Sequence, residues 1–143
     1  MSGRAGNKLP RGVHRERGPA QQGAARAEFE IWSTGELERL GGLVAENVVH
    51  HDPYDPHAAD GLVGLRKSIE ANRTTFPDMR IEVEDQVAEG DRVATRWLAT
   101  MTHPEAGRVE MRGITIERFE DGKVVESWRS MDMLGMLRQI GAR

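Results

Sequence analysis

The sequence predicts an α+β domain, with helices in its first half and an antiparallel sheet in its second half. Apolar residues recur at helical spacing as far as residue 76, and at every second position from residue 81 onward. Turn-forming residues divide the second half into four extended runs. Because helices and strands are segregated along the chain, we expect the helices to cover one face of the sheet.

Three helices are predicted before the sheet. The first places Ala25, Phe29 and Trp32 on one face. The second begins with a capping box formed by Ser33 and Glu36. Its apolar face consists of Leu37, Leu40, Leu43 and Val44. An extended piece at residues 47–51 and a proline-rich loop at residues 52–56 follow, and the third helix runs from Asp60 to Pro77.

Four strands and a short terminal helix complete the domain. The alternating runs predict strands at residues 81–88, 92–103, 108–119 and 123–131. Glu89-Gly90-Asp91, residues 104–107 and Asp121-Gly122 have the composition of the intervening turns. The last helix is expected at residues 134–140.

Composition divides the chain into a basic tail and one acidic body. Residues 1–20 are rich in Gly, Pro and Arg, so we expect a disordered tail followed by a single domain at residues 21–143. Residues 1–26 carry a net charge of +5 and the rest carry −8, which does not favour binding to nucleic acid. The absence of cysteine excludes disulfides and thiolate chemistry. No apolar run is long enough for a membrane span and no signal peptide is recognisable, so a cytoplasmic location is expected.

Asp132 is the first candidate catalytic residue. It follows the last strand, on the face predicted to hold Trp128, while Ser127, Arg129 and Met131 take the other face. An acid in an apolar cavity has a raised pKa and can serve as general acid or base. The alternative is structural, because Asp is also a good N-cap for the terminal helix. The spacing leaves both roles open.

Histidines are the other candidates. His50 and His51 are adjacent on an extended segment and must face opposite sides, so no metal site is expected and one of them can face a pocket. His103 lies at the end of a strand, either at a pocket rim or in a turn. Mid-strand Arg96 and Arg118 are expected to form ion pairs with nearby acids.

Motifs for nucleotide binding, zinc proteolysis and serine hydrolysis are absent from the sequence. Cofactor-free acid–base chemistry or ligand binding remains as the expected function. No cofactor and no metal are expected.

The sequence resembles the SnoaL-like polyketide cyclases, which belong to the nuclear-transport-factor-2-like superfamily. The resemblance spans roughly Ala25 to Gly141. It is carried by segments at residues 48–53, 75–78, 88–94, 96–97 and 102–103, and most strongly by residues 113–118, 121–128 and 132–141.

This resemblance implies a cone-shaped fold, in which a curved sheet wraps around three N-terminal helices and encloses a deep apolar pocket. It implies that Asp132 is the acid/base of an intramolecular aldol closure, with His51 and His103 near the pocket. The pocket residues expected beside them are Trp97, Thr115, Trp128 and Met101. An apolar small-molecule substrate and a homodimer or homotetramer are also implied, and exposed strand residues such as Leu98, Ile114, Ile116 and Val125 favour a partner.

Other functions of the same fold stay open. An epoxide hydrolase would need two carboxylates and an arginine, for which Asp85, Glu117 and Arg96 are the candidates. A branch that assists anthracycline hydroxylation is not distinguished from cyclisation. A ligand carrier or assembly module would have Asp132 bonded to backbone donors. Relatives carry a longer segment where residues 104–108 form a tight turn, which predicts a more open site here.

Overall fold

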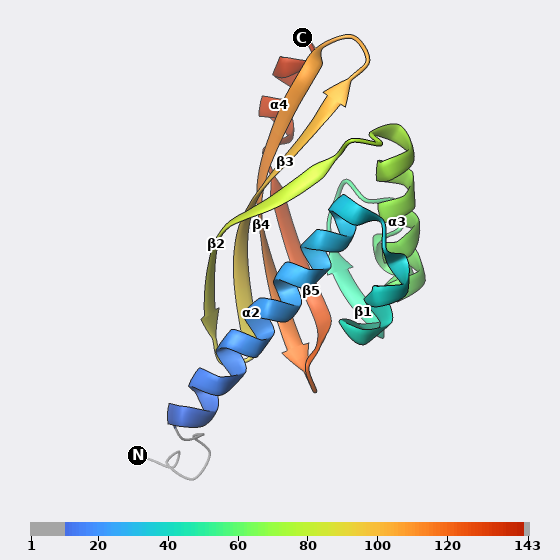
Figure 1. Ribbon diagram of the computed structural model, residues 1–143. Coiled ribbons are helices and arrows are strands. Elements are labelled where there is room, and N and C mark those ends of the chain that lie inside the picture. Colours follow the sequence, from blue (N-terminus) through green and yellow to red (C-terminus); the bar gives the residue numbers. More distant parts are fainter. Residues whose placement is uncertain (1–10, 142–143) are drawn as a thin grey trace.

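The computed structural model describes residues 11–141, with side chains from residue 17 onward. Its frame is a curved, open five-stranded sheet with helices on one face, which confirms the predicted α+β class (Figure 1). The strands lie in the order β1-β5-β4-β3-β2. Their bounds are β1 Val44–His51, β2 Arg80–Glu89, β3 Arg92–His103, β4 Gly107–Glu120 and β5 Lys123–Met131.

The helices cover the inner face of this sheet and close one of its ends. The longest, α2 (Arg11–Thr34), crosses β2 and β3, and α3 (Gly61–Thr75) packs against β1 (Figure 1). The short helix α4 (Met133–Gln139) follows β5 and rests on β4. Two 3₁₀ helices, η1 (Leu37–Gly42) and η2 (Ala58–Asp60), flank β1 in the sequence. Within the described residues, no helix is long and apolar enough to cross a membrane.

The core lies between α2, α3 and the inner face of the sheet. Alternation along β3 turns Val93, Thr95 and Trp97 inward, and all three are buried. On α2, Ala25, Phe29 and Trp32 face them, as their spacing predicts.

The sheet differs from the predicted antiparallel meander at one edge. Strands β2 to β5 pair antiparallel in sequence order, and β3 and β5 have the predicted bounds. The extended piece before residue 52 is longer than predicted, and it joins β5 in parallel as a fifth strand. A register shift between Val83 and Asp85 also turns Val87 outward, so the predicted alternation fails there.

The predicted second helix is wrong in type and position. Ser33 lies in the last turn of α2, and its hydroxyl accepts a hydrogen bond from the Ile81 N–H at 2.8 Å instead of capping a new helix. Gly35, with φ +79°, ends α2. Because Gly41 and Gly42 weaken a helix, only the 3₁₀ segment η1 forms, and Val44 already belongs to β1.

The predicted disordered tail differs from the structure in its second half. Residues 1–10 lie outside the described residues, whereas residues 11–20 form the first turns of α2. This part of α2 approaches the β2–β3 hairpin: Gln21 Nε2 donates to the Gly90 carbonyl at 2.9 Å, and Gly18 passes close to Ala88. Tertiary contacts of this kind support a helix whose composition does not predict one.

Candidate functional site

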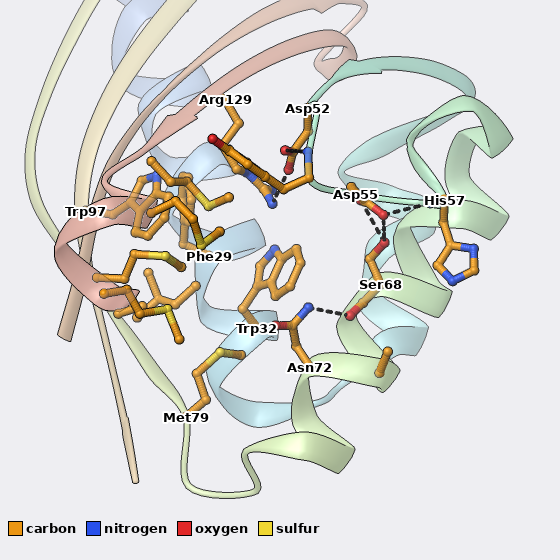
Figure 2. A pocket seen from close by; sticks show the side chains of 18 of the residues that line it. Phe29, Trp32, Asp52, Asp55, His57, Ser68, Asn72, Met79, Trp97 and Arg129 are labelled. Atoms are coloured by element: carbon orange, nitrogen blue, oxygen red, sulfur yellow. Dashed lines mark hydrogen bonds and ion pairs between the residues drawn. The ribbon is translucent and has the colours of Figure 1, made fainter. Parts of the chain in front are cut away.

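An apolar cavity of about 280 Å³ opens between α2, α3 and the inner face of the sheet (Figure 2). Its apolar wall is mostly methionine and aromatic, contributed by Phe29, Trp32, Tyr54, Met79, Trp97, Met111, Met131, Met133 and Met136. Methionine side chains are flexible and polarisable, so such a wall adapts to flat apolar ligands. The polar side chains of the lining are Asp52, Asp55, His57, Ser68, Asn72 and Arg129.

The lining contains a largely buried ion pair between Asp52 and Arg129. Arg129 Nη1 lies 3.3 Å from Asp52 Oδ2, with 16% of the arginine side chain and 6% of the aspartate side chain exposed. The guanidinium carbon also lies 5.0 Å from the centre of the Trp32 ring, in a cation–π contact. The other oxygen of Asp52 accepts a hydrogen bond from the Tyr54 N–H at 3.0 Å.

The parallel pairing of β1 with β5 explains this meeting of distant residues. His51 is the register partner of Trp128, so the residues that follow them, Asp52 and Arg129, are neighbours at the end of β1. Pro53 cannot continue the strand, and the chain turns away immediately after Asp52.

Asp55 fastens the loop after β1 to α3. The Ser68 hydroxyl lies 2.8 Å from both carboxylate oxygens and shares its one proton between them, and Oδ1 accepts a hydrogen bond from the His57 N–H at 2.8 Å. Asn72 extends the network by donating to the Ser68 carbonyl at 2.9 Å (Figure 2). These hydrogen bonds hold the loop in place, and the loop forms one wall of the cavity.

Asp132 occupies the position of a helix cap. Its Oδ1 accepts a hydrogen bond from the Gly135 N–H at 2.9 Å, at the N-terminus of α4. The side chain is exposed and does not belong to the cavity lining, although its neighbours Met131 and Met133 do. Of the two roles that the spacing leaves open, the geometry is that of the cap.

His51 and Trp128 lie on the outer face of the sheet, away from the cavity. Their rings stack with centroids 5.3 Å apart, and His51 Nε2 lies 2.8 Å from a carboxylate oxygen of Glu126. That hydrogen bond, together with Arg118, lowers the pKa of Glu126. As predicted, His50 faces the opposite side of β1, with Nδ1 2.6 Å from the Ser127 hydroxyl.

The remaining predicted residues divide between cavity, core and turn. Trp97 lines the cavity, and its Nε1–H donates to the buried Thr115 hydroxyl at 2.9 Å, so Thr115 supports the wall from behind. Met101 is buried in the core. His103 ends β3, and its Nδ1 accepts hydrogen bonds from two backbone N–H groups of the following turn at 3.2 Å. Among the seven predicted residues, Trp97 alone belongs to the described cavity lining.

The candidate epoxide hydrolase set does not assemble. Arg96 is half-exposed on the outer face, where it pairs with Glu84 at 3.0 Å and with Asp85 at 3.8 Å. Glu117 is buried on the inner face of β4. The three side chains therefore lie on opposite sides of the sheet.

Asp52, Asp55 and Arg129 are not among the residues that the sequence predicts for the site. Two signals point to them in retrospect. Both aspartates directly precede a proline in the loop after β1, and Arg129 shares its strand face with Ser127 and Met131, which is unusual for a charged residue in a core. Neither signal says that the residues meet, since that depends on the parallel pairing.

The family model of the SnoaL-like polyketide cyclases matches residues 22–140. The chain belongs to this family. IdmH, a candidate polyketide cyclase from Streptomyces antibioticus, is 32% identical with a TM-score of 0.76, over 85% of this chain and 99% of that one. A loop-truncation variant of IdmH is 33% identical, with a TM-score of 0.75 and the same coverage.

Two further solved structures show the range of names among similar proteins. A candidate polyketide cyclase from Bacillus cereus is 30% identical with a TM-score of 0.76, over 85% of this chain and 80% of that one. AclR, a candidate hydroxylase from Streptomyces galilaeus, is 27% identical with a TM-score of 0.72, over 86% and 85%. The search of curated proteins gave no significant match.

Proposed function

We propose that this protein is a cofactor-independent cyclase that closes a ring by intramolecular aldol addition within a small apolar dicarbonyl compound. The observation that carries the proposal is the Asp52–Arg129 pair in the wall of an apolar cavity. The two opposite charges compensate each other in the cavity wall, and the pair as a whole is neutral. An apolar substrate can therefore enter the cavity without burying an uncompensated charge.

The pair supplies a base and an oxyanion partner at one point. With the substrate carbonyl oxygen held by the Arg129 guanidinium, the Asp52 carboxylate takes the proton from the adjacent carbon. Arg129 stabilises the enolate oxygen, and the enolate carbon attacks the second carbonyl of the same molecule. The proton on Asp52 then passes to the new alkoxide, so the product is an isomer of the substrate and the enzyme returns to its starting state.

The cavity favours a compact and flat substrate. Its volume of about 280 Å³ lies at the lower end of ligand pockets, which span roughly 300–1,000 Å³. Methionine and aromatic side chains surround this space and favour contact with an aromatic or conjugated ring. Small aryl 1,5-diketones, whose aldol closure forms a six-membered ring, are suitable test compounds.

The proposal is tested by comparing Asp52→Asn with Asp132→Asn. Ring closure of aryl 1,5-diketones, and exchange of their α-protons with D₂O, are followed by NMR. We expect Asp52→Asn to lower both rates by roughly 10²–10⁴-fold, the usual contribution of a general base. We expect Asp132→Asn to change them less than twofold, because that side chain lies outside the cavity lining and asparagine is an equally good cap.

The two variants also separate the base proposed here from the one implied by the family resemblance. If Asp132→Asn abolishes turnover while Asp52→Asn retains it, the assignment of the base to Asp52 is wrong. Affinity for the same diketones, measured by quenching of tryptophan fluorescence, shows whether a loss of rate reflects loss of binding.

A second candidate function is non-catalytic binding of an apolar small molecule. The cap geometry of Asp132 favours it, because a backbone-bonded Asp132 is what the sequence predicts for a ligand carrier. In that case the cavity binds the diketones, and neither wild type nor Asp52→Asn accelerates proton exchange.

A further inference from the structure

A second group of buried charges lies beneath α2, behind the wall of the cavity. Glu28 of α2 is 3% exposed and Glu117 of β4 is 1% exposed, and their carboxyl groups lie within hydrogen-bonding reach of each other. Acids are almost never fully buried without a partner of opposite charge. Two of them side by side in a core therefore need an explanation.

The register of the sheet places polar side chains around this pair. Glu117 pairs with Ser127, and Ser127 pairs with His50, so three polar residues form one row across β4, β5 and β1. Arg129 lies two residues beyond Ser127 on the same face of β5. Arg129, whose guanidinium faces the cavity, therefore stands beside this row.

Two buried carboxylates in contact repel each other strongly when both are ionised. Among the described residues, no donor reaches Oε1 of Glu28 or Oε1 of Glu117, and both atoms are buried. Burial raises the pKa of Glu117 well above its ordinary value, and the charge of Glu28 raises it further. One proton between the two groups gives the pair a donor and removes the repulsion.

The effect of this proton on its surroundings depends on the other titratable and charged groups that face the pair. On β1, burial lowers the pKa of His50, which is therefore neutral at pH 7. On β5, Arg129 couples electrostatically to both Glu117 and His50. Asp52 and Asp55, in the loop after β1, couple to His50. Arg129 is thus the positive charge to which both the acid pair and Asp52 are attracted.

We propose that Glu28 and Glu117 share one proton at neutral pH, and that this proton keeps the Arg129 guanidinium on Asp52, at the cavity wall. With the proton present, the pair carries one negative charge and Asp52 holds the arginine. Without it, two adjacent negative charges draw the arginine inward, away from the cavity. Glu28 and Glu117 are then positioning residues for Arg129, and this role does not depend on the chemistry proposed for the cavity.

The proposal has a definite pH dependence. The pKa of Glu117 is raised in the folded protein, so its contribution to stability is present below the ordinary Glu value of 4.5 and is lost as the pH rises towards the raised value. Across that interval, the unfolding equilibrium constant of the wild type rises by up to tenfold per pH unit for one proton. Glu117→Gln cannot ionise and lacks this rise.

The shared proton is detected by infrared spectroscopy of the whole chain without ligand. At pH 7, we expect the wild type to show the C=O stretching band of a protonated carboxyl, and we expect Glu117→Gln and Glu28→Gln each to lose it. Glu126→Gln is the matched control, since this partly buried acid on the outer face of β5 has a lowered pKa and its substitution should leave the band unchanged. The shared proton is excluded if the wild type lacks the band, or if the band survives in both glutamine variants.

The positioning of Arg129 is measured separately by NMR of its guanidinium resonances, assigned with Arg129→Lys. In the wild type, these resonances should shift over the pH range in which the carboxyl band disappears, and in Glu117→Gln they should stay constant. Wild-type resonances that remain constant while the band disappears would show that the pair shares a proton without positioning Arg129.

Discussion

At the scale of single residues, two aspartates illustrate how position decides chemistry. Asp52 and Asp132 each follow a strand, and both have a short acidic side chain at the point where the strand ends. Asp132 is followed by a helix, so its carboxylate satisfies the Gly135 N–H. Asp52 is followed by a proline-punctuated loop instead of a helix, and its carboxylate meets Arg129.

The cap role of Asp132 predicts a change in stability. Asp132→Ala removes the acceptor for the Gly135 N–H and should lower the free energy of unfolding by about 1 kcal/mol. Asp132→Asn keeps an acceptor and should change the free energy of unfolding by no more than a few tenths of a kcal/mol. Urea denaturation measures both values. Equal losses in the two variants would show that the hydrogen bond does not stabilise α4.

At the scale of elements, the pairing of β3 with β4 shapes the cavity wall. Gly113 is the register partner of Trp97, and a Cβ at this glycine would collide with the indole ring. Because Gly113 has no side chain, the Trp97 ring has room to lie against β4 while its Nε1–H donates to the Thr115 hydroxyl. A glycine inside a strand often marks such a close approach.

This contact predicts that Gly113→Ala displaces Trp97. Overpacking of a filled core should lower the free energy of unfolding by about 1–3 kcal/mol and weaken binding of apolar ligands in the cavity. Gly41→Ala is the control, because a Cβ there meets no atom within 4 Å. Urea denaturation and tryptophan fluorescence report the two effects. Equal stability of the two variants would mean that Trp97 adjusts freely.

At the scale of the whole molecule, the outer face of the sheet carries an apolar stripe. The register aligns Trp128, Ile116, Ala94 and Val87 across four strands, with His51 stacked on Trp128 at the β1 edge. Ile116 is 39% exposed and Val87 is 67% exposed. Apolar residues gathered in this way favour association, in line with the homodimer or homotetramer that the family resemblance implies.

We therefore expect Ile116→Glu to weaken self-association. In the oligomer, the substitution would place a charge where an isoleucine is expected to be buried against the partner. Because burial of an isoleucine side chain contributes about 1.5–3 kcal/mol, the dissociation constant of the oligomer should rise at least tenfold. Val63→Glu, at an exposed apolar residue on α3, is the matched control. Sedimentation velocity over a range of concentrations gives the constants. A wild type that stays monomeric at its highest soluble concentration would contradict the expectation.

The local pattern of apolar and turn-forming residues determined the fold class of this protein and the bounds of two of its strands. The change of hydrophobic period, together with Gly and Pro in the turns, was sufficient to predict the α+β class, the bounds of β3 and β5, and the opposite faces of His50 and His51. These features depend on residues close together in the chain, whose spacing acts directly on backbone geometry.

Only the tertiary structure decided the composition of the site. Asp52 and Arg129 are far apart in the sequence and meet because β1 pairs with β5 in parallel. Glu28 and Glu117 meet because α2 lies on the inner face of the sheet, towards which Glu117 points. The α2 helix extends back to Arg11 because it packs on the β2–β3 hairpin. Charge pairing, burial and helix docking are energies between distant segments, so no local spacing records them.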